Sequence, residues 1–183
     1  MAGSLVQVDT FTVTSAVASV IIGGGSSGSS STNFAINTDD VYMVALNNVK
    51  PATDAVNLNV RFTVSGTADS SSNYDRAFAK LSASSSFSDI SSTNQDKLRT
   101  SGHNTGTGTS ETANGIIYCF NFNNSSEYSF ITSEETSFGA DTNARGNQGG
   151  GVLTVAQATD GIQFLFSSGN IASGTFKLYG LVK

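Results

Sequence analysis

Residues 115–132 read GIIYCFNFNNSSEYSFIT and form the densest aromatic segment of the chain. The large apolar side chains that alternate with smaller or polar residues along it are Ile116, Tyr118, Phe120, Phe122, Tyr128 and Phe130. Alternation with a period of two is typical of β-strands, and the NNSS run at 123–126 is typical of a turn. The stretch therefore predicts one complete β-hairpin.

The length of the loop decides which side chains face each other across this hairpin. An odd number of loop residues places Phe120 opposite Phe130 and Phe122 opposite Tyr128, whereas an even number places aromatic residues opposite polar or small ones. Three-residue hairpin loops need one left-handed residue, and asparagine adopts that conformation more readily than other non-glycine residues. We therefore expect an odd loop, with all aromatic side chains on one face that forms the core of a sandwich.

Length and composition are those of one globular domain spanning residues 1–183. The chain has 183 residues, of which 38% are hydrophobic and 19 are glycine. This apolar content lies in the ordinary globular range, and the length is short for two domains. The chain can therefore bury a substantial core despite its abundant serine, threonine and asparagine.

Charge and residue counts exclude several classes of function. Only 13% of residues are charged and the net charge is -5, which argues against a nucleic-acid partner. Cys119 is the single cysteine and His103 the single histidine, so no internal disulfide and no His/Cys zinc cluster can form. The first 25 residues lack a basic segment and contain Asp9, and no apolar run is long enough to cross a bilayer. We expect no cofactor, no metal and no membrane insertion.

The rest of the chain predicts many short strands and no long helix. Besides the hairpin, the strands are expected over residues 5–13, 16–22, 41–46, 56–64, 77–81, 152–156, 162–166 and 175–182. A parity slip near Asp9 fits a bulge, 23–33 reads as a flexible surface loop, and a short helix or other ordered excursion is expected over 91–98. In 56–64 one face is expected to be buried and the other wet or at an interface. The pattern predicts an all-β fold, an antiparallel β-sandwich of jelly-roll or lectin-like type with long polar loops.

Two long polar segments, 84–114 and 134–151, are the candidate binding loops. Loops too long for simple turns often carry function. These two offer many hydrogen-bonding groups and little apolar area, which suits a glycan or a polar protein surface; the alternative is that they are solvated and idle. The side chains within them chosen as candidate binding residues are Arg99, His103, Asn104, Asp141 and Arg145.

No residue pattern in the chain is typical of a catalytic centre. There is no G-x-S-x-G nucleophile motif, and His103 lies in the polar stretch SGHNTGTG, where it is expected to be a solvated loop residue. The carboxylate pairs at 39–40 and 134–135 lack the spacing of a calcium site and are expected in turns or on the surface. Cys119 is expected to be a small buried hydrophobe. We therefore expect the protein not to be an enzyme.

Four segments together resemble a known family. They are DVYMVALNNV at 40–49, SGTADSSSNYDRA at 65–77, NGIIYCFNFNNSSEYSF at 114–130 and SGNIASGTFKLYGL at 168–181. In this order they resemble small β-rich virion proteins of marine tailed bacteriophages, including cyanophages. The resemblance covers most of the chain and implies a place on a phage particle; it implies no catalytic residues.

Two functions follow as expectations from this resemblance. The first is a structural protein on the particle surface, of the capsid-decoration or head-fibre type, made in the host cytoplasm. The alternative is a tail-fibre tip or receptor-binding adhesin that recognises a host surface glycan; an enzyme that cleaves surface polysaccharide is a third class without a supporting motif. The expected partners are copies of the same chain, as a trimer, and other phage structural proteins of the capsid or tail.

Overall fold

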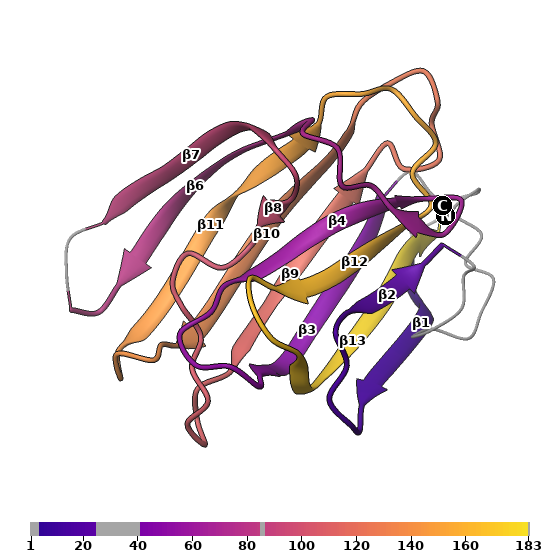
Figure 1. Ribbon diagram of the computed structural model, residues 1–183. Coiled ribbons are helices and arrows are strands. Elements are labelled where there is room, and N and C mark those ends of the chain that lie inside the picture. The colour runs from indigo at the N-terminus through magenta and orange to yellow at the C-terminus, as the bar shows by residue number, and fades with distance from the viewer. Residues whose placement is uncertain (1–3, 25–40, 85–86, 183) are drawn as a thin grey trace.

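The computed structural model describes residues 4–24, 41–84 and 87–182. No helix in this described part of the chain is long and apolar enough to span a membrane. Every named element is a β-strand, and the strands pair antiparallel throughout (Figure 1). The all-β prediction is therefore confirmed. The surface loop expected at 23–33 falls almost entirely outside the described residues.

The strands form two sheets of unequal width. In spatial order the eight-stranded sheet contains β1 (Ser4–Val13), β13 (Ile171–Val182), β3 (Val41–Pro51), β9 (Ala113–Phe120), β10 (Ser129–Phe138), β11 (Ala144–Leu153), β6 (Tyr74–Ser82) and β7 (Ser88–Gln95). The five-stranded sheet contains β2 (Val20–Gly23), β12 (Gly161–Phe166), β4 (Leu58–Val64) and β5 (Thr67–Ala68), with β8 (Leu98–Arg99) also paired to β4.

The order of the strands is that of a jelly roll. Strands β1-β13-β3-β9 of the larger sheet match β2-β12-β4-β5 of the smaller one, and the chain crosses between sheets from β1 to β2, from β3 to β4 and from β12 to β13. This interleaving defines a double-sheet sandwich. The remaining strands, β10, β11, β6 and β7, extend the larger sheet beyond the smaller one (Figure 1).

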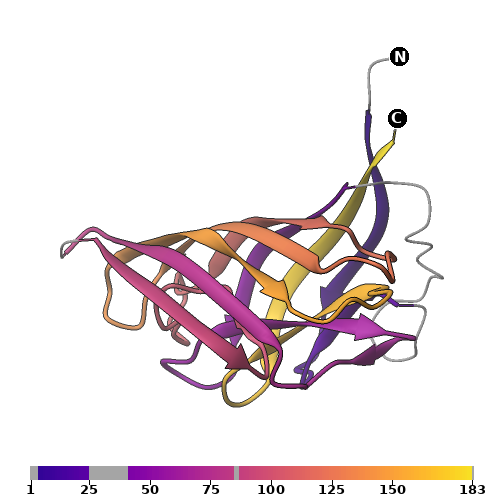
Figure 2. The ribbon, with the colours of Figure 1, turned by 90° about the horizontal axis from the view of Figure 1, so that it is seen from above.

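The hydrophobic core lies between the two layers, which Figure 2 shows from above. Phe164 of β12 packs on Phe176 of β13 with ring centroids 4.9 Å apart, which joins the two sheets. Phe62 of β4 contacts Phe122 at 4.9 Å and meets Tyr74 of β6 edge-on at 5.6 Å. The Tyr74 hydroxyl also accepts a hydrogen bond from the Phe62 N–H at 3.0 Å, so this buried polar group is satisfied within the core.

The aromatic hairpin forms, but its aromatic face points away from the core. Phe120 lies opposite Phe130, as an odd loop requires, and Asn123 in the loop has a left-handed φ of 59°. The expected pairing of Phe122 with Tyr128 is wrong, because the strands end before these residues and only Phe122 turns inward. The side chains that line the core are the smaller alternate ones, Ile117, Cys119 and Ile131.

The outward-facing aromatic side chains of the hairpin instead belong to an apolar band on the outer face of the larger sheet. Neighbouring strands continue it, since Tyr118 lies opposite Met43, Met43 opposite Tyr179, and Phe130 opposite Val152. We call these residues the outer band: Leu5, Met43, Ile116, Tyr118, Phe120, Phe130, Val152, Tyr179 and Leu181. Tyr118 and Phe130 are each about two-fifths exposed, at 40% and 41%.

Two other sequence predictions need correction. Strand β4 is not wet on its second face, because Asn59 and Thr63 are buried beside the apolar residues. The expected helix at 91–98 is the edge strand β7 followed by β8, and the expected loop at 134–151 is the hairpin of β10 and β11. By contrast, the bulge near Asp9 is confirmed by a register shift between Gln7 and Asp9.

The triple glycine at the end of the expected loop is needed inside strand β11. A Cβ atom on Gly149 would lie 2.3 Å from the Ala77 carbonyl oxygen and 2.6 Å from the Phe78 Cα, both on the neighbouring strand. A side chain cannot be accommodated there without moving the backbone of β6. A glycine-rich run is typical of a loop in the sequence. Here it allows two neighbouring strands to pack closely.

The buried strand β4 yields a prediction about stability. Phe62→Asp places an unpaired charge in the core and should abolish soluble folding, at a cost of several kcal/mol. Asn59→Asp should also destabilise, by about 2–4 kcal/mol, because the buried amide nitrogen of Asn59 donates to the Asn57 carbonyl at 2.9 Å and a carboxylate cannot. Urea unfolding of both variants measures the effect.

Ser91→Asp is the matched control, since Ser91 is exposed on β7 and the substitution should change stability by about 0.5 kcal/mol or less. Wild-type stability of Asn59→Asp would mean that the second face of β4 is open to water.

Candidate functional site

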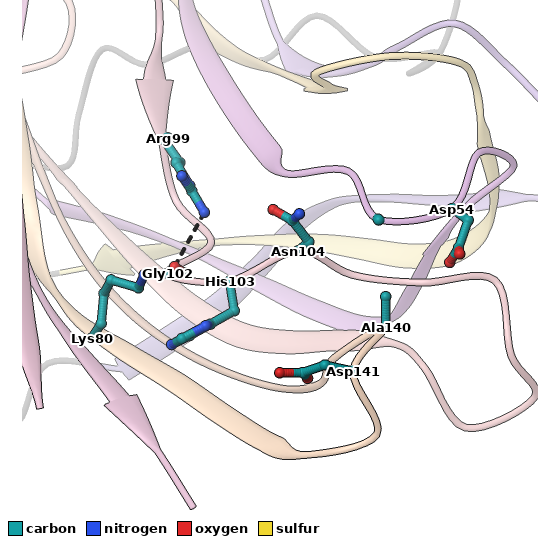
Figure 3. A pocket seen from close by; sticks show the side chains of 9 residues that line it. Asp54, Lys80, Arg99, Gly102, His103, Asn104, Ala140 and Asp141 are labelled. Carbon is teal, nitrogen blue, oxygen red and sulfur yellow. Dashed lines mark hydrogen bonds between the residues drawn. The ribbon is translucent and has the colours of Figure 1, made fainter. Parts of the chain in front are cut away.

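Three loops meet strand β6 around a cavity of about 480 Å³ at one end of the sandwich. Its side chains come from the loop before β4, the end of β6, the end of β8 with the segment that follows it, and the turn between β10 and β11. The lining residues are Asp54, Ala55, Lys80, Arg99, Gly102, His103, Asn104, Ala140 and Asp141 (Figure 3). The cavity is polar and contains charges of both signs.

Backbone hydrogen bonds hold these loops together. Thr105 pairs with Val56 on one side, with N···O distances of 2.8 and 3.1 Å, and forms a bridge with Gly139 on the other. The Ala140 N–H donates to the Asn104 carbonyl at 3.2 Å. Segment 102–107 is thus fixed between the β3–β4 loop and the β10–β11 turn. The cavity wall is therefore an ordered part of the fold.

Asn147, on the inner face of β11, anchors the same segment to the sheet. Its side-chain oxygen accepts the Gly102 N–H at 2.9 Å, and its amide nitrogen donates to the Thr100 carbonyl at 2.6 Å. Gly102 lies so close to the strand that a Cβ atom would come within 2.9 Å of the Asn147 Cβ. The buried side chain of Asn147 thus holds segment 100–102 against the sheet through these two hydrogen bonds.

Arg99 is held in place by the backbone of its own segment. Its Nε donates to the Ser101 carbonyl at 2.6 Å, and its Nη2 donates to the Gly102 carbonyl at 3.1 Å. Burial, with the nearby Arg76 cation, lowers the pKa of Arg99, which still remains a cation at neutral pH. The guanidinium is therefore a fixed positive group at the cavity.

His103 is half-buried in the cavity rather than solvated, which corrects the expectation for this residue. Its Nε2 is buried and has no hydrogen-bond partner among the described residues. Burial lowers the pKa of His103, and the cations of Lys80 and Arg145 lower it further, whereas Asp141 acts in the opposite direction. The imidazole is therefore neutral at neutral pH and lies in a net positive field.

Arg145 lies behind the wall rather than in it. It forms an ion pair with Asp141, four residues earlier, and donates to the Ser82 hydroxyl. The hydrogen bond from Arg145 lowers the pKa of the Asp141 carboxyl. This pair fixes the turn between β10 and β11, so Arg145 orients a lining residue without lining the cavity itself.

Glu135 is a buried carboxyl group beneath this region. It lies on the inner face of β10, opposite Asn147, and is 7% exposed. Burial raises the pKa of Glu135 well above its usual value, although the Arg99 cation opposes the shift. Its Oε2 has no hydrogen-bond partner among the described residues. The expectation that 134–135 is a surface pair therefore holds for exposed Glu134 and is wrong for Glu135.

No protein family, curated protein or solved structure matches the chain.

The structure brings the five sequence-predicted residues together. Four of them, Arg99, His103, Asn104 and Asp141, line the cavity, and Arg145 is paired to the fourth. Sequence reasoning missed Lys80 and Asp54, which complete the wall from segments read as a strand and a turn. The signal for Lys80 is its position on the inward-facing side of β6, where it lies opposite Asn147.

Cys119 behaves as the sequence predicts. It is 2% exposed on the inner face of β9, and burial raises the pKa of its thiol. A thiolate is the nucleophilic form of cysteine, and this environment disfavours it. Cys119 is therefore part of the core.

The position of segment 134–151 changes what a deletion should do. Shortening a solvated loop would leave the melting temperature nearly unchanged. Here the segment supplies two paired strands in the middle of the larger sheet, so shortening it should unfold the protein. Only the turn between β10 and β11 can be altered without loss of the ladder.

The buried carboxyl of Glu135 predicts a dependence of stability on pH. The unfolded chain loses this proton near pH 4.5 and the folded chain only at higher pH, so the folded state binds more protons between these two values. The free energy of unfolding should therefore fall as pH rises through this window. Glu135→Gln should remove this part of the decline and stabilise the protein at pH 7.

Urea unfolding between pH 4 and pH 8 measures the effect as a difference between variant and wild type. Glu134→Gln is the matched control, because it removes the same charge from the outer face of the same strand. The His103 contribution is common to all three proteins and cancels. A difference between Glu135→Gln and wild type that is constant with pH would contradict the assignment.

Proposed function

We propose that this chain is a non-enzymatic structural protein on the surface of a bacteriophage particle, of the capsid-decoration or head-fibre type. Three features support the proposal: the resemblance of four segments to phage virion proteins, the jelly-roll sandwich, and the outer band. The outer band is the observation that carries it.

The outer band is a surface suited to contact with another protein. It runs across neighbouring strands of the larger sheet and includes two half-exposed aromatic residues, Tyr118 and Phe130. Contiguous apolar patches on a protein surface commonly mark interaction sites, and aromatic residues and methionine are enriched there. The band has no charged member, and the charged residues Asp75, opposite Val152, and Glu134, opposite Ile116, lie at its border.

The partners we propose are copies of the same chain, as a trimer, and the phage structural proteins beneath them. The low content of charged residues, 13%, leaves uncharged faces for both kinds of contact. Sedimentation of the purified chain at high concentration measures self-association. A chain that stays monomeric in sedimentation, together with the absence of three-fold clusters on particles, would overturn the proposed trimer.

A second candidate is a receptor-binding adhesin of the tail-fibre type, which recognises a glycan on the host surface. The polar cavity favours it, because loops fixed at one end of a rigid sandwich can offer hydrogen bonds in a defined arrangement. Electron cryomicroscopy of purified particles distinguishes the two candidates, since it locates the chain on the head or on the tail. Particles that lack the chain altogether would overturn both.

The outer band yields a prediction about assembly. Tyr118→Glu and Phe130→Glu should each reduce incorporation into particles at least about tenfold, because a carboxylate would be buried against an apolar contact. Both side chains are partly exposed, so the melting temperature should change by about 5 °C or less. Complementation of a phage lacking the gene, followed by quantitative blotting of purified particles, measures incorporation.

Thr12→Glu is the control, because Thr12 is exposed on β1 opposite Thr175, and the change adds the same charge to the outer face of the same sheet away from Tyr118 and Phe130. If the band variants enter particles as well as this control does, the band is not the assembly surface.

A further inference from the structure

Among the described lysine and arginine side chains that form no ion pair, Lys80 and Arg99 line the same loop-end cavity. Arg61 and Lys97 both pair with Asp96, and Arg145 pairs with Asp141. Lys80 and Arg99 have no carboxylate within 4.0 Å among the described residues. Both are partly buried, and both line the same cavity of a chain whose net charge is -5.

Groups around Lys80 and Arg99 leave this positive charge uncancelled. Burial raises the pKa of the Glu135 carboxyl, although the Arg99 cation opposes the shift, and so favours its neutral form. Asp141 is already paired with Arg145. Burial lowers the pKa of His103, and the cations of Lys80, Arg145 and Arg99 lower it further against the opposing effect of Asp141. The electrostatic field on this side of the cavity is therefore positive, and a bound anion would stabilise the cations of Lys80 and Arg99.

The other side of the cavity offers hydrogen-bond acceptors and an amide. Figure 3 shows Lys80, Arg99 and His103 toward one side, Asp54 at the other, and Asn104 between them. One oxygen of Asp54 accepts the Thr107 N–H at 3.2 Å, which orients the carboxylate. Carboxylate and amide groups in this arrangement bind hydroxyl groups, because they accept and donate hydrogen bonds at fixed positions.

We propose that this cavity binds an acidic sugar, with its carboxylate toward Lys80, Arg99 and His103 and its hydroxyl groups toward Asn104 and Asp54. The volume, about 480 Å³, suits one or two sugar rings. A neutral sugar would leave the two cations unpaired. A compact anion without hydroxyl groups would leave Asn104 and Asp54 unused and would meet the Asp54 charge.

This inference gives a ligand class for the recognition function offered above as the second candidate. It is tested on the purified chain alone, so its failure is distinguishable from a failure of localisation on the particle. Protein that binds the sugar but is absent from particles would overturn only the phage assignment. Protein found on particles that binds no acidic sugar would overturn only the inference drawn here.

Isothermal titration calorimetry of the full chain with three probes tests the ligand class. The probes are digalacturonic acid, the neutral disaccharide galactobiose and inorganic phosphate, all at the same ionic strength. We expect digalacturonic acid to bind at least about tenfold more tightly than either of the others. Equal binding of galactobiose would show that the cations contribute nothing to affinity. Equal or tighter binding of phosphate would show an anion site without sugar recognition. Either result overturns the proposal, and so does the absence of binding to all three probes.

Lys80→Gln should weaken binding of digalacturonic acid at least about tenfold, because it removes a charge-assisted contact and keeps a polar side chain. Lys177→Gln is the matched control, since Lys177 lies on the outer face of β13 and opposite Ala45, away from the cavity. Asn104→Ala should weaken binding through the hydroxyl groups. Thermal melts of all three variants establish that each is folded, and unchanged affinity in folded Lys80→Gln would overturn the proposal.

Discussion

The unequal width of the two sheets is the constraint on which the rest of this structure depends. Four strands of the larger sheet are matched by strands of the smaller one, and four extend beyond it. An extended sheet has an inner face with no second sheet to pack against, so something else must cover it. Here the cover is β8 and the polar segment that follows it, fixed by Asn147 and by the close approach of Gly102 to β11.

This constraint explains why the inner face changes character across the sheet. Where the sheets overlap, inward side chains are apolar, as with Val44, Ile117 and Phe176. Beyond the overlap they become Ser133, Glu135 and Asn147, and the Asn147 side chain bonds backbone groups of the covering loop. Such partners offset the cost of burying a polar group. Glu135 Oε2 has no hydrogen-bond partner among the described residues, and burial of this carboxyl raises its pKa.

Sequence periodicity predicted where strands lie, and it could not predict which face of each strand points toward the core. Alternation in 115–132 gave the hairpin and the Phe120–Phe130 pair, yet the choice of inner face depends on what packs on the sheet, which no local pattern contains. The larger aromatic residues point outward and Ile117 and Cys119 inward. The segment 134–151 was missed as strand because its inward residues are polar and its glycines are required by contact with β6. The candidate residues came from two separate polar segments, and they lie at one cavity because Thr105 of the first segment pairs with Gly139 of the second.

Strand parity separates the two surfaces of this protein. Along β10, Phe130 and Glu134 point outward, whereas Ile131 and Glu135 point inward, so neighbouring residues belong to different environments. The outer band lies near the start of β10 and the loop-end cavity lies at its far end, on the other side of the sheet. A strand of ten residues spans about 33 Å, which places the two surfaces well apart. Contact with a neighbour through the outer band would therefore leave the cavity open, and one molecule can be held in an assembly while its loops face outward.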